Sequence, residues 1–415
     1  MQNPISPPCE TDHHHLWRIT LAVMFTAQFL SGVGFSFVLP FFPFYFRFLG
    51  VEGNKDVLLW MGWSSAVFGI TMAFSAPLWG LLADRYGRKL MVIRSMFAGS
   101  IILGLMGLAT NPWHLLILRI FQGATTGTIS ASVTLVSSVT PSVNLGMSLG
   151  LMQTAMLLGT AAGPYVGGIL AEHYGFRVPC GLAFLILLMG TLLVIFGASE
   201  KFVPPRNTKN EGLKIIQSII HTKGFKLILS IYFLIYVLST MIIPILPLYI
   251  ERLLGTNSRA ESLTGAFVGM TGLLAGMSAV GYGKLGDRFG YSRILIFSLI
   301  ATGLVTIPQS FAYSIRVLFI ERCLTGLAIG GLIPSVNALV SNSISREKIG
   351  SAYGLTAGVT CFGIGMGPFI GGTMASLIGL QWPFAIMGIS AFVIAVVFYV
   401  MSAYHSDGTL FEYRR

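Results

Sequence analysis

The sequence predicts an all-α membrane protein with twelve transmembrane helices in two pseudo-symmetric six-helix bundles. Three observations lead to this prediction: an apolar composition, a series of long apolar runs and an internal repeat. Of the 415 residues, 54% are hydrophobic and only 10% are charged, and the mean hydropathy is +0.78. Because about a quarter of the residues in a soluble domain are charged, this composition excludes an ordinary soluble enzyme, a disordered chain and a nucleic-acid-binding protein.

Polar segments divide the chain into apolar runs, each long enough for the roughly 20 residues that cross a bilayer as a helix. An even number of such runs places both termini on the same side of the membrane. The expected helices cover residues 19–46, 57–82, 91–110, 114–138, 146–170, 178–199, 227–250, 262–283, 293–311, 316–340, 350–374 and 382–403.

The distribution of basic residues indicates which side the termini occupy. If the N-terminus is cytoplasmic, the segments on that side hold roughly three times as many Lys and Arg as the opposite segments, as the positive-inside rule requires. We therefore expect a multi-pass inner- or plasma-membrane protein with both termini in the cytoplasm. The expected parts are a tail (1–18), a first bundle (19–199), a basic linker (200–226) with an interfacial amphipathic helix near 213–220, a second bundle (227–403) and a tail (404–415).

A shift of 203 or 204 positions aligns the two halves of the chain. Two parallel repeats imply a pseudo-two-fold axis along the membrane normal, which is the design of transporters that rock one half against the other around a midplane site. The matched residues are Pro40, Pro43 and Tyr45 with Pro244, Pro247 and Tyr249, Arg119 and Gly123 with Arg322 and Gly326, and Gly163, Pro164, Gly167 and Gly168 with Gly367, Pro368, Gly371 and Gly372.

The loop after the second helix has a copy in the second half. Glycine permits a tight turn between closely packed helices, and an Asp near a helix N-terminus interacts favourably with the helix dipole. We expect Asp84 to face the helix start near Gly350, and Asp287 to face the one near Gly146, so that the two contacts latch the cytoplasmic side shut. The alternative is a positively charged turn without a gating role. The gating-loop residues are Gly80, Asp84, Arg85, Gly87 and Arg88, and Gly283, Asp287, Arg288 and Gly290.

The fourth helix carries an arginine within the span. A charge at that depth is costly, so such a residue usually faces water or a partner. Arg119, Gln122 and Thr126 recur at helical spacing on one face, which we expect to line the cavity. The alternative is a buried arginine that backbone carbonyl groups satisfy.

The fifth helix carries a run of glycines with one proline. Small residues let helices approach closely, and proline bends a helix. The expected result is a pliable interface that suppresses proton leak, and the alternative is plain helix packing. The motif consists of Gly150, Gly159, Gly163, Pro164, Gly167 and Gly168.

These three motifs resemble the signatures of the major facilitator superfamily, and the helix-5 motif resembles that of its twelve-span drug:proton antiporter family. The resemblance covers the whole chain apart from its tails. It implies the major facilitator fold and a secondary transporter, not an enzyme. This transporter would export drugs or other amphiphilic small molecules in exchange for protons by alternating access. The segments Ser36–Pro40 and Ala83–Met91 resemble one branch, which is associated with fosfomycin and bile-salt resistance.

An antiporter needs a titratable group at membrane depth. Glu321 is the one carboxylate within the expected spans, and a carboxyl group in apolar surroundings binds a proton more readily than one in water. Arg322 and Arg119, at equivalent repeat positions, are the other candidates for proton coupling. Because Glu321 lies about 100° around the helix from Arg322, the alternative is that it neutralises an arginine of a neighbouring helix.

The resemblance also implies which helices line the cavity, namely 1, 4, 7 and 10, with 2, 5, 8 and 11 beside them. Aromatic and Met side chains accept varied apolar ligands because they repack readily, and buried arginines attract anions. The expected substrate contacts are Phe25, Gln28, Gln122, Gln153, Tyr232, Tyr236 and Asn337.

We expect no cofactor and no metal, with the proton gradient as the energy source. The chain lacks a Walker-type phosphate loop, its four cysteines are too scattered to pair or to bind a metal, and His13–His15 belong to the expected tail. The expected partners are a small-molecule substrate, protons and the lipid bilayer, without nucleic acid, and the chain is expected to act as a monomer. The alternatives are a dedicated exporter of one metabolite, siderophore or lipid, a transporter-like sensor without flux, and an uptake symporter, which the helix-5 motif disfavours.

Overall fold

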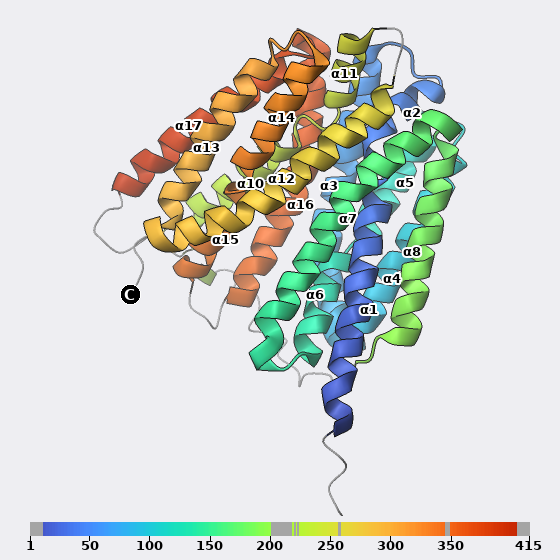
Figure 1. Cartoon of the computed structure of the whole chain (residues 1–415), viewed down its shortest axis with the longest axis vertical. Coiled ribbons are helices and arrows are strands. Elements are labelled where there is room, and N and C mark those ends of the chain that lie inside the picture. The colour runs from blue at the N-terminus through green and yellow to red at the C-terminus, as the bar shows by residue number, and fades with distance from the viewer. Residues whose placement is uncertain are drawn as a thin grey trace, which may run out of the picture.

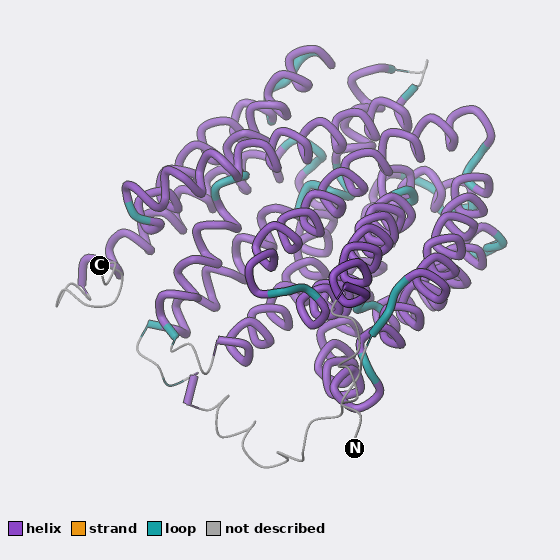
Figure 2. Tube along the Cα trace, turned by 60° about the horizontal axis from the view of Figure 1, so that its bottom comes forward, coloured by secondary structure: helices purple, strands orange, loops and turns teal. Residues whose placement is uncertain are grey.

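The computed structural model describes residues 11–200, 218–219, 221, 224–255, 259–344 and 349–404. Its helices form two groups that lie side by side (Figure 1). The start of α1 and the end of α17 lie toward one face, which we call the terminus face, while α2 and α11 lie at the opposite end, the far face (Figures 1 and 2). Residues 1–10 and 405–415 of the expected tails and most of the expected linker lie outside the described residues. Of the expected amphipathic helix, only residues 218–219 are described, and they are helical.

The first half runs from α1 to α8, and α1 already begins inside the expected tail. Its elements are α1 (Thr11–Ser36), η1 (Leu39–Phe41), α2 (Phe42–Phe48), α3 (Asn54–Tyr86), α4 (Arg88–Gly107), α5 (Pro112–Thr125), α6 (Thr128–Val139), η2 (Ser142–Asn144), α7 (Leu145–Tyr174) and α8 (Arg177–Gly197).

The second half repeats this order from α10 to α17. Its elements are α10 (Phe225–Thr240), α11 (Leu246–Leu254), α12 (Ala260–Phe289), α13 (Tyr291–Gln309), α14 (Ile315–Ile329), α15 (Leu332–Ser343), α16 (Ile349–Ile378) and α17 (Trp382–Tyr404). Within the described ranges, ten helical segments are long and apolar enough to cross a membrane by length and composition.

Four expected spans are not continuous helices, and proline or glycine stands at each break. Pro43 and Pro247 lie in the first turns of α2 and α11, where a missing backbone N–H costs least. Gly127, between α5 and α6, has φ +147°, a conformation that side chains disfavour. Gly330 and Gly331 separate α14 from α15. The expected spans that the structure divides in this way are 19–46, 114–138, 227–250 and 316–340.

Equivalent contacts in the two halves confirm the repeat. The Tyr45 hydroxyl donates to the carbonyl oxygen of Met106 at 2.6 Å. Its counterpart Tyr249 donates to that of Gln309 at 2.9 Å. Each bond ties the broken first span of its half to the third, so the same constraint is used twice.

The three cysteines in the described ranges, Cys180, Cys323 and Cys361, are free thiols, as expected. Cys9 lies outside the described residues. The backbone of His13–His15 belongs to the start of α1, but their side chains also lie outside the described part.

The two halves meet through α3 with α16 and through α7 with α12. At the far face these helices touch backbone to backbone: a Cβ on Gly168 would lie 2.4 Å from the carbonyl oxygen of Glu261, and one on Gly372 would lie 2.6 Å from that of Leu58. Toward the terminus face the helices part (Figure 1). Seven glycines at those ends of the four helices have no heavy atom within 4 Å of a Cβ position, whereas Gly286 contacts Tyr291 of its own half. The seven are Gly80, Gly146, Gly150, Gly281, Gly283, Gly354 and Gly358.

Half of the helix-5 motif packs inside the first half. A Cβ would lie 2.5 Å from the Phe29 carbonyl oxygen at Gly159, 2.0 Å from the Ser36 hydroxyl at Gly163 and 2.2 Å from the Phe37 carbonyl oxygen at Gly167. These glycines therefore seat α7 on α1, while their neighbour Gly168 packs across the halves. Gly150, at the terminus-face end of α7, contacts neither α1 nor the second half.

We predict that Gly167→Ala destabilises the protein and that Gly150→Ala does not. The new methyl group at position 167 meets fixed backbone, and overpacking of this kind costs about 1–3 kcal/mol. At position 150 it enters open space. The measurement is the thermal unfolding temperature of the purified protein in detergent, and equal loss in both variants would contradict this account of the motif.

Candidate functional site

A buried cluster around Arg119 lies in the first half. The guanidinium Nη1 donates to Gln122 Oε1 at 2.9 Å, and Nε donates to the Ser64 hydroxyl at 3.4 Å. The rings of Phe42 and Phe68 lie 4.6 and 5.0 Å from it. Arg119 and Gln122 are only 5% and 4% exposed, so this face is buried in the present conformation rather than open to a cavity.

The setting of Arg119 differs from both expectations for it. Side chains and aromatic rings, not backbone carbonyl groups, hold the guanidinium. Within the described part of the chain it has no ion pair. Thr126, the third residue of the expected face, donates to the Gln122 carbonyl oxygen of its own helix. The result is a desolvated positive charge whose cost is offset by hydrogen bonds and cation–π contacts rather than by a carboxylate.

The equivalent position in the second half is built differently. Arg322 is half-buried, and among the described residues its Nε has no hydrogen-bond partner. The residue that replaces the glutamine is Thr325, which accepts from Gln309 Nε2 at 2.6 Å. The two arginines are therefore not interchangeable.

Glu321 is half-buried, and its Oε2 has no hydrogen-bond partner among the described residues. The ion pair with an arginine of a neighbouring helix, one of the two expectations, is also absent among them. The carbonyl oxygen of Glu321 accepts from Gln309 Nε2 at 3.5 Å. Because the Gln309 carbonyl oxygen accepts from Tyr249 of α11, Glu321 lies toward the far face.

The structure brings three of the expected substrate contacts together in the second half. The Tyr232 hydroxyl, from α10, donates to Asn337 Oδ1, from α15, at 2.9 Å. The rings of Tyr232 and Tyr236 are stacked with centroids 5.4 Å apart. Tyr232 is 6% exposed, while Tyr236 and Asn337 are half-buried. We call this group the tyrosine cluster.

The other expected contacts are more scattered. Gln28 of α1 is 1% exposed; its Nε2 donates to the sulfur of Met156 of α7 at 3.3 Å, and its Oε1 has no partner. Phe25 is half-buried and Gln153 is exposed. Gln122 belongs with Arg119, as described above. Of the seven residues, three form the tyrosine cluster, one belongs with Arg119, and Phe25, Gln28 and Gln153 occupy three further positions.

The repeated loops make the tight turns that their glycines predict. Gly87 has φ +97° between α3 and α4, and Gly290 has φ +90° between α12 and α13. Arg85 and Arg288 lie over the rings of the aromatic residues that follow them, at 5.4 and 5.3 Å. Their positions at the helix ends place both guanidinium groups on the terminus face.

Of the two contacts in the expected latch, the one between Asp287 and the helix start near Gly146 is not made in this conformation. Asp287 accepts a hydrogen bond from Tyr291 of its own half at 2.5 Å, and open space surrounds Gly146. The side chain of Asp84 and the surroundings of Gly350 lie outside the described set. The separation of the helices at the terminus face explains the missing contact.

Glu200, which the sequence analysis did not select, caps the start of α4. Its two carboxylate oxygens accept from the backbone N–H groups of Arg88 and Lys89 at 2.9 and 2.8 Å. In return, Lys89 Nζ donates to the carbonyl oxygens of Ile195 and Ala198 at 2.8 and 2.7 Å. The sequence did contain a signal for this cap, because Glu200 is an acidic residue directly after the apolar span 178–199 and the loop at Arg88 and Lys89 is basic.

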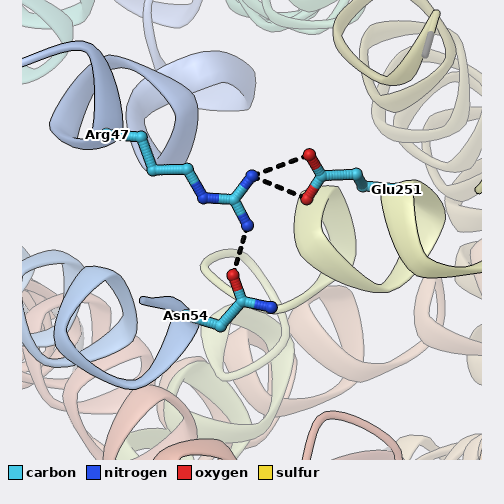
Figure 3. A network of polar contacts seen from close by, with 3 residues as sticks. All are labelled: Arg47, Asn54 and Glu251. Carbon is cyan, nitrogen blue, oxygen red and sulfur yellow. Dashed lines mark hydrogen bonds and ion pairs between the residues drawn. The ribbon is translucent and has the colours of Figure 1, made fainter. Parts of the chain in front are cut away.

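An ion pair joins the two halves at the far face (Figure 3). Arg47 Nη1, from α2, lies 2.7 Å and 2.8 Å from the carboxylate oxygens of Glu251, from α11, and Nη2 donates to Asn54 Oδ1. Among the described residues it is the only ion pair. The two residues are 204 positions apart, so they are repeat equivalents that meet at the pseudo-two-fold axis. Opposite charges at equivalent positions were a signal that the sequence analysis missed.

Together these features allow binding and movement. The halves are closed at the far face and parted at the terminus face, and each half carries a polar cluster, at Arg119 in the first and at Tyr232 in the second. A desolvated guanidinium attracts an anionic group, while stacked tyrosines offer apolar surface and hydroxyl groups.

Comparison with known proteins shows what the chain resembles. Residues 24–280 and 228–410 match the sequence model of the Major Facilitator Superfamily. The multidrug resistance protein MdtG of Escherichia coli (strain SMS-3-5 / SECEC) is 36% identical over 385 residues, which cover 91% of this chain and 93% of MdtG.

Solved structures share the fold. The human organic anion transporter MFSD10 (TETRAN) superposes with a TM-score of 0.70 at 16% identity, covering 95% of this chain and all (100%) of the other. The nucleoside transporter NupG superposes with a TM-score of 0.74 at 14% identity, covering 94% and 99%. At these identities the likeness concerns the fold alone.

We predict that reversing one charge of the far-face ion pair loosens that face. Arg47→Glu places two carboxylates at the contact, whereas Arg47→Glu combined with Glu251→Arg restores the attraction. The measurement is the rate at which a membrane-impermeant thiol reagent labels Leu58→Cys, which is 2% exposed in the closed contact, in a background without native cysteines. The single reversal should raise this rate severalfold and the double reversal should return it toward the original value. A double variant that labels as fast as the single one would contradict the role of the pair.

Proposed function

Because the chain belongs to the Major Facilitator Superfamily, we propose that it exports drugs or other amphiphilic small molecules in exchange for protons. It is a secondary transporter, not an enzyme, and an integral multi-pass protein of the inner membrane. The 36% identity to MdtG over nearly the whole of both chains supports multidrug efflux as the direction and breadth of transport.

The observation that carries the mechanism is the contrast between the two faces. Backbone contacts and the ion pair Arg47–Glu251 close the far face, while the same helices stand apart at the terminus face. The excess of basic residues on the terminus side supports its assignment to the cytoplasm. In this proposal the conformation is open to the cytoplasm, and the loops at Asp84 and Asp287 close that side when the far face opens.

The proposed substrate site combines the tyrosine cluster with the polar groups of α1, α5 and α7. Gln28 keeps an unpartnered buried oxygen, and Arg119 keeps its charge without a carboxylate. Both gain when a ligand supplies the missing partner. An anionic or hydrogen-bonding group beside Arg119 and an apolar surface on the tyrosines fit the same molecule.

The proposed proton carrier is Glu321, with Arg322 and Arg119 modulating it. Its Oε2 is buried without a partner, which suits a group that gains and loses a proton during the cycle. The proton gradient supplies the energy, no cofactor takes part, and the chain works as a monomer.

The proposal predicts that several unrelated compounds collapse a proton gradient in inverted vesicles with an acid interior. A panel of fosfomycin, bile salts and cationic dyes is added, and a pH-sensitive dye reports the gradient. Glu321→Gln should abolish the effect, and Arg316→Gln, a nearby exposed charge change, should leave it intact. Activity of Glu321→Gln would place the coupling group elsewhere. A response to one compound alone would identify a dedicated exporter, and no response would refute drug:proton exchange.

A second prediction concerns the tyrosine cluster. Tyr232→Phe removes the hydroxyl that donates to Asn337 and should raise the apparent KM for a transported compound severalfold with little change in maximal rate. Tyr45→Phe, which loses an equally buried hydroxyl outside the cluster, serves as the control in the same vesicle assay. An unchanged KM in Tyr232→Phe would remove the cluster from the substrate site.

A further inference from the structure

A groove on the first half lies apart from the clusters described above, at the far-face ends of α3 and α5. Three indole rings, with leucine and valine side chains, form its almost entirely apolar surface, and Asp56 also belongs to its lining; the indoles are Trp60, Trp63 and Trp113. We call it the tryptophan groove. Its volume is about 350 Å³, which lies within the range of small-molecule sites, ~300–1,000 Å³.

The indole rings converge on the groove at fixed angles. Trp60 and Trp113 meet edge to face with centroids 4.9 Å apart, and Phe46 stacks on Trp60 at 5.9 Å. Trp63 makes an edge contact at 4.9 Å with Phe369 of α16, in the other half. Trp63 and Trp113 nevertheless remain 54% and 58% exposed, so their faces are available to a ligand.

The lining carries one formal charge, and it is negative. Asp56 lies in the first turn of α3, and its side chain is exposed. No Lys or Arg belongs to the lining. Aromatic faces around a single carboxylate attract an organic cation, because the ring quadrupole and the negative charge act in the same direction.

The repeat shows that the fold does not require this combination. The two halves keep the same register here. The carbonyl oxygen of Leu58 contacts Gly372, and that of its counterpart Glu261 contacts the equivalent Gly168. Asn111 and its counterpart Ser314 are the N-caps of α5 and α14. At equivalent positions the second half has Arg259 for Asp56, Leu263 for Trp60, Ala266 for Trp63 and Arg316 for Trp113.

Tryptophans are common where spans meet the membrane surface. That tendency acts equally on both halves, yet one half carries three indoles with an acid and the other carries two arginines. The difference therefore reflects a feature of the first half itself rather than its depth in the membrane.

We propose that the tryptophan groove binds a lipophilic organic cation, with a quaternary ammonium group between the indole faces and Asp56. The site is separate from the central clusters, and its occupancy does not depend on the proposed transport. Its contact with Phe369 places the bound cation beside the seam between α3 and α16.

The test uses the full-length protein in a maltoside detergent, which carries no ammonium group. The probe is a trimethylammonium-bearing nitroxide, which quenches tryptophan fluorescence on contact, and the matched control probe is the uncharged hydroxyl-bearing nitroxide. Asp56→Asn should require about fivefold or more probe for half-maximal quenching. Glu52→Gln, an exposed acid outside the groove, should stay within about twofold of the unaltered protein.

A second variant tests the groove independently, in case Asp56→Asn fails to fold. Trp113→Leu replaces an exposed ring and should weaken the response to the cation severalfold while the thermal unfolding temperature stays unchanged. Equal quenching by the two nitroxides, or an unchanged response in both variants, would overturn the proposal. If added phosphatidylethanolamine displaces the cation from the unaltered protein, the natural occupant is a lipid headgroup and the proposed organic cation is wrong.

Discussion

The whole arrangement depends on how closely the two halves approach at one end. At the far face the backbones of α7 and α12, and of α3 and α16, touch without side chains between them, which only glycine permits at Gly168 and Gly372. Toward the terminus face the same helices separate. Because long helices transmit a tilt over their full length, contact at one end and separation at the other are two consequences of one geometry.

Charge is distributed unequally over this frame. The far face has its ion pair at the pseudo-axis, between repeat equivalents, where the attraction is partly exposed and therefore weak. The buried Arg119 instead has hydrogen bonds and aromatic rings, while Arg322 and Glu321 retain unpartnered atoms. A weak lock and incompletely satisfied polar groups suit a protein that must leave one state for another. The repeated helices make the far-face contact about which the halves can move, and the polar groups that differ between the halves are the candidates for binding substrate and protons.

Much of the fold could be predicted because hydropathy and repetition are local signals. The all-helical membrane fold, the turns at Gly87 and Gly290 and the family resemblance are confirmed, and ten of the described helical segments are long and apolar enough to cross a membrane. The breaks near Pro43, Pro247 and Gly127 were missed, since an apolar run does not show where a helix is interrupted within it. Less of the site was predictable. Spacing along one helix joined Arg119 to Gln122, but the pairs Tyr232–Asn337 and Arg47–Glu251 and the cap by Glu200 depend on contacts between distant segments, which periodicity cannot show.

The central claim is that α7 and α12 pivot about their far-face contact. Distances between spin labels on these two helices test it most directly. One pair, Met147→Cys with Leu285→Cys, reports on the terminus face, and the other, Tyr174→Cys with Arg259→Cys, reports on the far face; all four positions are exposed. In lipid nanodiscs, a change of pH or addition of a transported compound should shorten the first distance and lengthen the second together. Distances that change in the same direction, or a change at one face alone, would contradict the account.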